Sequence, residues 1–532
     1  MVEITAFLLY NKDMKKEHKS AAEWQTLLAK KEDEIASLNR QVEWLTQQLR
    51  LMQGQRFGTS SERTQVISEQ FSLFNEAEEL AEPKAAEPDL EQITYQRRKQ
   101  TGKRDLDFSK LPTEQIVHGL PEGERICPEC GGALHQCGQS VARRELVYVP
   151  AQYKVVEHIQ AVYSCRRCEQ ENDQVPMKKG AVPAPLIPGS GIVSASLLAH
   201  ILNSKYTLAL PLYRQEQELI QLGVPVSRQN MANWVIAAYE RWFSDFFQAL
   251  RQELLSNDIL HADETSLMVL REPGRKAQQK SYVWVYRTSG DSKHPVVLYD
   301  YQPSRARECA SDFLKGFSGF LHTDGYEAYH CKLPPGITAV GCWAHMRRKF
   351  TDTLKSLPKE VRERSPAQVG LDYCNRLFQL ESDFAEQELS FQDRHQARLE
   401  RSKPIAEEFF IWAKAEYKKN PVPKSMFGAA LTYAVRQEGW LMNVFLDGRL
   451  ELSNNRVERA VRPFAVGRKN WLFSNTPKGA DASAAVYSIV ETAKANGLRP
   501  FLYLKLLLER LSCGTPMESC LPWHPSLQSL CK

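Results

Sequence analysis

Residues 259–265 read ILHADET, the start of a strand-like run that carries two adjacent carboxylates and extends to residue 270. Four further strand-like runs follow along the chain, at residues 281–287, 295–301, 319–323 and 337–342. A helix capped by Ser304 and ending near Gly316 is expected between the third and fourth of these five runs. Three adjacent strands, a helix and further strands are the element order of a ribonuclease-H-like α/β core.

This predicted core is interrupted by a long helical segment. Residues 351–444 are charged, show helical periodicity and contain few strand signals. We therefore expect an α-helical insertion there, between a first part of the catalytic core at 251–350 and a second part at 445–500. The remaining residues, 501–532, are treated as a C-terminal tail without an assigned role.

Three carboxylates stand in places that suit metal binding better than folding. Asp263 lies in the first strand, Asp324 closes the run FLHTDG, and Glu458 lies in SNNRVERA, which reads as a helix start. Successive strand residues face opposite sides, so Asp263 and Glu264 cannot share one site, and Asp263 shares its side with apolar residues. At about 4 Å, each pair of carboxylates would repel by roughly 4 kcal/mol at an effective dielectric near 20.

Divalent cations would remove that repulsion. Carboxylates favour Mg²⁺ (or Mn²⁺) over softer metals. The sequence therefore predicts that Asp263, Asp324 and Glu458 hold a two-metal site for phosphoryl transfer. Two structural alternatives stay open, because Asp324 before Gly325 also suits a turn and Glu458 also suits the far half of a capping box begun by Asn455.

A basic segment follows the last strand. Residues 341–349 read GCWAHMRRK, in which Cys342 and His345 stand three apart at a helix start. Two ligands do not complete a zinc site, so we interpret this pair as orienting the rim of the site or as packing. The basic residues here and near residue 468 are predicted to contact DNA phosphates, which position the protein without reading sequence: Arg347, Arg348, Lys349, Arg468 and Lys469.

The N-terminal region shows a seven-residue repeat. One seam holds Ala21, Leu28, Ile35, Val42 and Leu49, and the other holds Trp24, Leu38, Leu45 and Met52, with Lys31 as the exception. This pattern predicts a coiled coil that makes residues 1–75 an oligomerisation region and the protein a homo-oligomer. An amphipathic helix folded onto its own domain is the alternative. Residues 76–110 have little periodic apolar content and are predicted to be a flexible linker.

Two cysteine pairs mark the next segment. Four thiolates suit tetrahedral Zn²⁺, and the intervening segments 145–149 and 153–163 read as strands that would bring the pairs together: Cys127, Cys130, Cys165 and Cys168. The gap between the pairs exceeds the common spacing of about 15–20 residues. We expect a small zinc-binding β domain over residues 111–180, with free buried thiols as the alternative and Cys137 as a substitute ligand.

Residues 181–250 are predicted to be a helical DNA-binding region. A helix from Leu212 to Gly223 is followed by a turn and by a second helix capped by Ser227, an order that resembles a helix-turn-helix. The first turn of the second helix would present side chains that can pair with base edges in a major groove: Arg228, Gln229, Asn230 and Asn233. An ordinary helical hairpin is the alternative.

The bulk properties limit the class of protein. A chain of 532 residues is too long for one core, so several domains are expected. No apolar run reaches the roughly 18 residues that a membrane span needs, and no export signal is visible. Twelve cysteines without secretion fit a reduced, cytoplasmic compartment. The net charge of +5 is small, but the basic residues are clustered as in nucleic-acid-binding proteins.

Together these motifs resemble the DDE-type transposases of the insertion-sequence 66 family over nearly the whole chain. The matching segments are RFG at 56–58 with Ser61-Glu62, the two cysteine pairs, HADET at 261–265, HTDGY at 322–326, GCWAHMRRKF at 341–350, NNRVER at 454–459 and GRKNWLF at 467–473. The resemblance implies Mg²⁺-dependent cutting at transposon ends and transfer of the 3′ ends into target DNA. It also implies a triad at Asp263, Asp324 and Glu458, helper proteins of the same element, and association with the nucleoid when DNA is bound.

Two other functions are compatible with the same residues. One is a non-catalytic DNA-binding regulator or inactive remnant of a transposase, which would bind ends without Mg²⁺-dependent nicking. The other is a ribonuclease-H-like DNA nuclease, which would hydrolyse DNA without joining ends. Survival of all three carboxylates argues against the first alternative, and a product assay separates the second.

Overall fold

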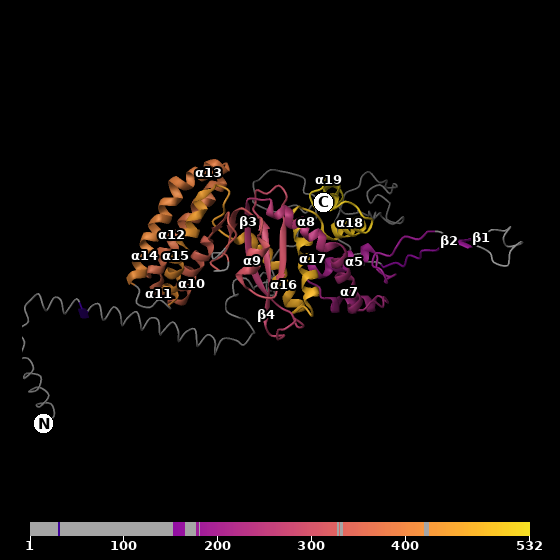
Figure 1. The fold of residues 1–532 in the computed structure, drawn as a ribbon. Helices are drawn as coiled ribbons and strands as arrows, with labels where there is room; N and C mark the ends of the chain where they lie inside the picture. Colours follow the sequence, from indigo (N-terminus) through magenta and orange to yellow (C-terminus); the bar gives the residue numbers. More distant parts are fainter. Residues whose placement is uncertain are drawn as a thin grey trace, which may run out of the picture. The chain divides into compact units, whose positions relative to one another are not determined.

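A computed structural model describes residues 30–31, 153–164, 177–179, 181–326, 329, 333–419 and 425–532 (Figure 1). Nearly all of the predicted coiled coil lies outside these residues, as do the predicted linker and the cysteines at 127, 130, 137, 165 and 168. The described part falls into a large unit, Pro183–Lys532, and a smaller one that ends at Val182. None of the described helices is long and apolar enough to span a membrane.

In the smaller unit a short hairpin is described. β1 (Val162–Ser164) pairs antiparallel with β2 (Met177–Lys179). The predicted strand over residues 153–163 is wrong for residues 153–161, which have no regular structure. The physical reason is that apolar side chains there lack a covering layer in the described part, since Val155 is 89% exposed and Ile159 is 87% exposed.

A mixed five-stranded sheet organises the large unit (Figure 1). Its strands are β3 (Ile259–Met268), β4 (Lys280–Thr288), β5 (Val297–Gln302), β6 (Gly319–His322) and β7 (Ile337–Val340). The order is β5-β4-β3-β6-β7, in which β3, β4 and β5 are antiparallel neighbours and β6 and β7 run parallel to β3. All five predicted strands are confirmed. The predicted helix is also present as α9 (Arg307–Phe313), although it starts after Ala306 rather than at Ser304.

The edge strand β5 is covered by α17 (Pro477–Ala495). Hydroxyl groups of this helix pair with the strand's backbone: Ser488 Oγ accepts from Tyr299 N at 2.8 Å, and Thr492 Oγ1 accepts from Val297 N at 3.0 Å. An uncovered edge strand would expose its backbone groups to pairing with another chain. The small, buried side chains of α17 let it lie close enough to β5 to prevent this.

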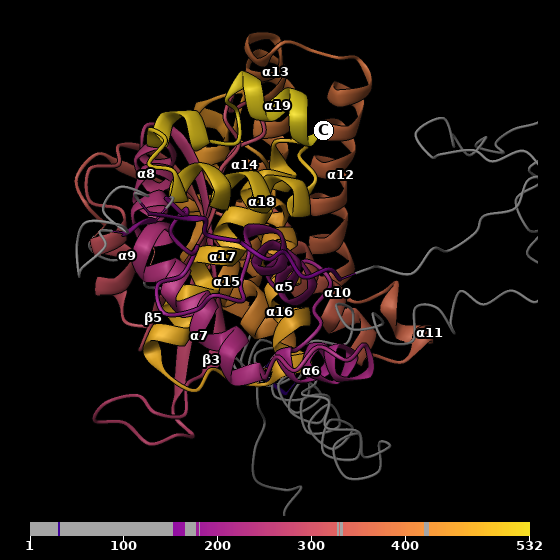
Figure 2. The same ribbon diagram turned by 90° about the vertical axis from the view of Figure 1, so that its right-hand side faces the viewer.

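Helices that precede the sheet in the chain, and helices that follow it, share one hydrophobic core with the sheet. They are α5 (Ala195–Tyr206), α6 (Leu212–Gln221), α7 (Arg228–Ala238), α8 (Ser244–Leu255), α18 (Pro500–Ser512) and α19 (Pro525–Cys531). α18 packs on α5 and α17 (Figure 2). The C-terminal segment is therefore part of this core, and Arg499 N donates to Cys531 O at 2.7 Å.

The helical insertion (orange in Figure 1) forms most of a second hydrophobic cluster, which also includes Ile259 of β3 and Val340 of β7. Its helices are α10 (Trp343–Ser356), α11 (Lys359–Arg362), α12 (Pro366–Glu386), α13 (Phe391–Ala397), α14 (Lys403–Lys419) and α15 (Met426–Met442). Backbone hydrogen bonds bring its two ends together, because Gly341 N donates to Trp440 O at 2.8 Å and Trp343 N donates to Leu452 O at 2.9 Å. The chain thus leaves β7 and returns to the sheet at one place.

A buried ion pair lies inside the insertion. The Arg398 side chain is 1% exposed and contacts the Glu381 carboxylate through two nitrogens, at 2.6 and 2.8 Å. Arg398 Nη1 also donates to Asp447 O at 3.3 Å, near the end of the insertion. Such a pair fixes geometry, because either charge left alone would be strongly destabilising.

We predict that Glu381→Gln lowers the free energy of unfolding by about 3 kcal/mol, since it leaves the Arg398 charge buried without its partner. Glu407→Gln is the matched control, because Glu407 pairs with Lys403 on the surface at 4.0 Å. That control should cost less than about 0.5 kcal/mol. Urea unfolding followed by circular dichroism measures both, and equal losses would contradict a structural role for the buried pair.

Candidate active site

The sheet places two of the predicted carboxylates side by side. β3 and β6 are parallel neighbours, and His261 on β3 is the register partner of His322 on β6. Asp263 and Asp324 each follow their histidine by two residues, so both lie just beyond the paired part of the two strands. The Asp324 carboxylate accepts a hydrogen bond from Tyr326 N at 2.8 Å. The turn role considered for Asp324 is therefore present, alongside its position next to Asp263.

Asn454 ties the helix that carries the third carboxylate to the same strand. It immediately precedes α16 (Asn455–Trp471), and Glu458 lies in the first turn of that helix. The Asn454 side chain is buried, donates to Ala262 O at 2.9 Å, and shares a 3.0 Å hydrogen bond with His261 Nδ1. These two contacts fix the start of α16 against β3, one residue before Asp263.

The carboxylates are close enough to affect one another. Burial raises the pKa of Asp263 well above its usual range, and the negative charges of Glu264, Asp324 and Glu458 add to the rise. A cluster of this kind favours a bound cation over further anions. Glu458 Oε1 is also buried and makes no hydrogen bond with any described residue. A divalent ion that prefers oxygen ligands, such as Mg²⁺, therefore suits the carboxylates of Asp263, Asp324 and Glu458.

Glu264 belongs to a network that the sequence did not reveal. Its side chain is 2% exposed, forms an ion pair with Arg305, and accepts a 2.7 Å hydrogen bond from Tyr329 Oη. Burial and the charge of Asp324 raise the pKa of Glu264, whereas Tyr329 and Arg305 oppose the rise. Glu264 thus has a cation and a hydroxyl group of the protein as partners. The position of Glu264 next to Asp263 was the one sequence signal for this network, because its partners Arg305 and Tyr329 lie 41 and 65 positions away.

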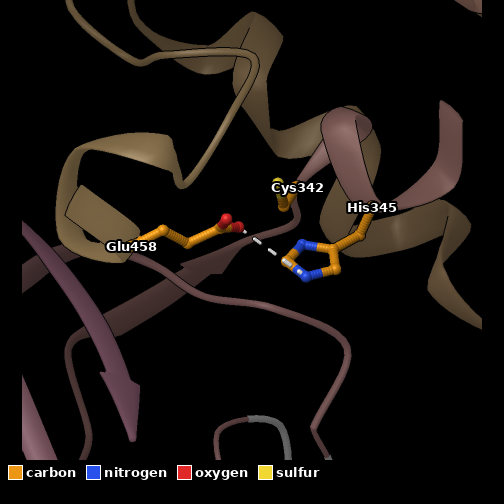
Figure 3. Close-up of side chains that lie close together, drawn as sticks. All are labelled: Cys342, His345 and Glu458. Atoms are coloured by element: carbon orange, nitrogen blue, oxygen red, sulfur yellow. Dashed lines mark ion pairs between the residues drawn. The ribbon is translucent and has the colours of Figure 1, made fainter. Parts of the chain in front are cut away.

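Cys342 and His345 lie beside Glu458 (Figure 3). His345 Nε2 is 3.7 Å from Glu458 Oε1, and Arg348 Nη2 is 3.6 Å from Glu458 Oε2. Burial disfavours the charged form of His345, but contact with Cys342 and the charges of Glu458 and Asp324 outweigh it and raise its pKa to about 9. The Glu458 carboxylate points toward His345 and Arg348. In the capping-box alternative it would instead turn back toward the backbone of Asn455.

A pair of stacked histidines stands two residues before Asp263 and Asp324 along the chain. His261 and His322 are buried, with ring centroids 4.4 Å apart and planes inclined by 10°. Burial lowers the pKa of His261 to about 4 and lowers the pKa of His322 well below its usual range. Both rings are therefore neutral near pH 7 and pack as flat polar groups. The sequence motifs contain both histidines, but the motifs alone gave no indication that the two rings stack.

The predicted phosphate-binding residues differ in their surroundings. Arg347 is exposed and lies over the Phe378 ring, and Lys349 lies over the Tyr433 ring. Arg468 donates hydrogen bonds to Thr265 and Ser266 on β3, so in this structure it holds α16 to the sheet. Lys469 is exposed. DNA contacts by all of these residues stay predictions.

α6 and α7 form the predicted helix pair. Ser227 caps α7 by accepting from Asn230 N, and the predicted core positions Met231, Trp234, Val235 and Ala238 are buried. The four predicted base-reading residues, Arg228, Gln229, Asn230 and Asn233, are exposed. Arg228 N donates to Glu216 on α6 at 2.8 Å, and Gln229 donates to Asn233 at 3.1 Å. A polar surface is thus available on α7.

Comparison with protein-family models gives four matches along the chain. The model described as "Transposase IS66 family" matches residues 190–482, and the "IS66 C-terminal element" matches residues 488–523. The "zinc-finger binding domain of transposase IS66" matches residues 124–169, which include the four predicted zinc ligands. This match supports a structural zinc. The model "Transposase C of IS166 homeodomain" matches residues 44–116.

Curated relatives cover most of the chain. Three proteins of Sinorhizobium fredii (strain NBRC 101917 / NGR234) are similar to it, and each is described as uncharacterized. Protein y4qI is 30% identical over 512 residues (92% of this chain and 90% of y4qI), and y4jD is 30% identical over 449 residues (80% and 83%). Protein y4hP is 28% identical over 519 residues (92% and 89%).

We predict that Asp263→Asn raises the melting temperature of the metal-free protein, because it removes a charge that burial and neighbouring carboxylates destabilise. A gain of about 1 kcal/mol corresponds to roughly 2–4 °C in a domain of 150–250 residues. Mg²⁺ should stabilise the wild type more than the variant.

Differential scanning fluorimetry in EDTA and in Mg²⁺ tests this prediction. Asp312→Asn is the control, because Asp312 is exposed and pairs with Lys315 on the surface. A lower melting temperature for Asp263→Asn in EDTA would show that the carboxylates do not repel one another.

Proposed function

Because this chain belongs to the IS66 transposase family, we propose that it binds transposon ends, cuts DNA there and transfers the cut ends to target DNA. The observation that carries the proposal is the placement of Asp263 on β3, Asp324 just after β6 and Glu458 in the first turn of α16, near enough for Asp324 and Glu458 to raise the pKa of Asp263. The strand order β5-β4-β3-β6-β7, with its mixed directions, supports a ribonuclease-H-like core.

Asp263, Asp324 and Glu458 would hold Mg²⁺ (or Mn²⁺) in this proposal. When bound, such ions activate a water or a 3′-hydroxyl group and stabilise the leaving oxygen of a phosphodiester. Asn454 sets the position of Glu458 relative to Asp263 through its contacts with His261 and Ala262. The neighbouring carboxylate Glu264 is paired with Arg305 and accepts a hydrogen bond from Tyr329, so it already has protein partners and is not needed as a metal ligand in this proposal.

Basic groups next to the carboxylates would receive the DNA backbone. The Arg348 side chain is 44% exposed and reaches Glu458, so it can also contact a phosphate that approaches this carboxylate. Arg347 on the same helix is exposed. Sequence reading is assigned to the exposed face of α7, and assembly to the N-terminal repeat, with helper proteins of the same element as further partners.

We predict that Asp263→Asn and Asp324→Asn each lower Mg²⁺-dependent cleavage of labelled transposon ends by at least ~1,000-fold, because each removes a ligand for ions that supply several kcal/mol of stabilisation. End binding should remain, as measured by gel shift. Glu407→Gln serves as a control that leaves the site untouched.

The products separate the remaining alternatives. Joined ends support the transposase, whereas hydrolysis alone supports the nuclease. End binding by the wild type without any Mg²⁺-dependent nicking supports an inactive remnant. Unchanged strand transfer by Asp263→Asn would falsify the assignment of this residue.

Replacing residues on α7 should separate base reading from phosphate contact. Gln229→Ala and Asn233→Ala should each weaken binding to transposon ends by about 1–3 kcal/mol while changing binding to unrelated DNA little. Arg347→Ala should instead weaken binding to transposon ends and to unrelated DNA alike. It should also reduce the slope of the logarithm of the binding constant against the logarithm of salt concentration by about 1. Fluorescence anisotropy at several salt concentrations measures these effects.

Gln252→Ala is the matched control for α7, because Gln252 is an exposed glutamine on the neighbouring helix α8. Equal loss of affinity for ends and for unrelated DNA in Gln229→Ala and Asn233→Ala would exclude base reading by this face.

A further inference from the structure

We infer that Cys342, His345 and Glu458 form a binding site for a thiophilic divalent cation such as Zn²⁺, distinct from the structural cysteine site. One sulfur, one nitrogen and one oxygen atom of these residues all lie within 4.8 Å of one another (Figure 3). In a tetrahedral zinc site the ligand atoms are separated by roughly 3.4–3.6 Å, given metal–ligand bonds of about 2.0–2.3 Å. Small side-chain movements therefore suffice to close the three groups around one ion.

Two polar atoms of this cluster lack hydrogen-bond partners. Glu458 Oε1 and His345 Nδ1 are both buried and form no hydrogen bond with the described residues. The 3.7 Å separation of His345 Nε2 from Glu458 Oε1 is too long for a hydrogen bond between them. Buried polar groups without partners are uncommon in folded proteins, and ion-binding sites are among the places where they occur.

Two backbone features around Cys342 suit a metal ligand at this position. Asn454 N donates a hydrogen bond to Cys342 Sγ at 3.1 Å, a contact of the kind that supports metal ligands from behind. Cys342 also stands at the N-cap of α10, where the helix dipole stabilises negative charge. Both effects are built from backbone groups that the fold holds in place.

The three ligands come from rigid elements. Cys342 and His345 stand one turn apart at the start of α10, and Glu458 lies in the first turn of α16. Three protein ligands leave a fourth position for water or for Asp324, whose charge already acts on His345. Arg348 pairs with Glu458 in the metal-free protein, but its partly exposed side chain can turn to solvent.

The donor set selects the class of ion. Sulfur and imidazole ligands prefer Zn²⁺ and similar ions, whereas Mg²⁺ prefers oxygen ligands alone. Because Glu458 is also a proposed magnesium ligand, the two ions would compete for one carboxylate. This consequence rests on the proposed function: Zn²⁺ should inhibit DNA cleavage even when Mg²⁺ is in excess.

A zinc titration of the full chain tests the site itself. After removal of metal by a chelator, the wild type should bind one more Zn²⁺ per chain than Cys342→Ser, or bind it at least ~100-fold more tightly, when a chromophoric chelator competes for the ion. Serine retains an acceptor for Asn454 N. His345→Gln should show the same loss, and it provides the test if Cys342→Ser fails to fold by thermal unfolding.

Cys309→Ser is the matched control, because Cys309 is a half-buried free cysteine outside the cluster. It should bind as much Zn²⁺ as the wild type. Replacement of zinc by Co²⁺ should add a sulfur-to-metal absorption band that Cys342→Ser lacks. Equal zinc stoichiometry and affinity in the wild type, Cys342→Ser and His345→Gln would overturn the inference.

Cleavage assays separate this inference from the proposed function. Zn²⁺ should inhibit Mg²⁺-dependent cleavage by the wild type more strongly than cleavage by Cys342→Ser, each measured relative to its own zinc-free rate. If Zn²⁺ binds as predicted but leaves cleavage unchanged, the zinc site stands and the catalytic role of Glu458 is contradicted.

Discussion

The hydrogen bonds of Asn454 are the constraint on which the arrangement of the site depends. Its side chain holds His261 and Ala262 on β3, its backbone N–H contacts Cys342 at the start of α10, and it immediately precedes α16. Three segments far apart in sequence are therefore joined at one buried residue. If one of these segments moved, a buried donor or acceptor would lose its hydrogen-bond partner. That cost keeps the three segments in their relative positions.

The neighbouring acidic side chains differ in the partners that the protein gives them. Glu264 forms an ion pair with Arg305 and accepts a hydrogen bond from the Tyr329 hydroxyl, so its carboxylate has partners within the fold. Asp263 accepts a hydrogen bond from Glu264 N, but burial and its carboxylate neighbours raise its pKa. The neutral, stacked His261 and His322 add no charge. The contrast between Glu264, which has protein partners, and Asp263, which has acidic neighbours, is what supports the proposed cation site.

Much of the fold could be predicted from the sequence because its signals are local. Alternation of apolar residues located all five strands, and Ser227 with the apolar spacing after it located α7. A shared site for Asp263 and Asp324 was predicted from the chemistry of carboxylates, and the parallel register of β3 and β6 accounts for their nearness. The Glu264 network, the stacking of His261 on His322, and the approach of His345 to Glu458 could not be predicted, since each depends on how distant segments pack. The tail at 501–532 was unassigned for a related reason: its helices are defined by a core that they share with α5.

The closed ends of the insertion carry an evolutionary consequence. Gly341 contacts Trp440 and Trp343 contacts Leu452, while most of the second hydrophobic cluster lies within the inserted helices themselves. A module whose entry and exit touch can be lengthened, shortened or exchanged between relatives without stretching the sheet that hosts it. Divergence among homologues is therefore expected to accumulate in α11 to α14, while the junction at residues 341–345 and 452–458 changes slowly. The same geometry makes this bundle a natural place to graft a new binding surface.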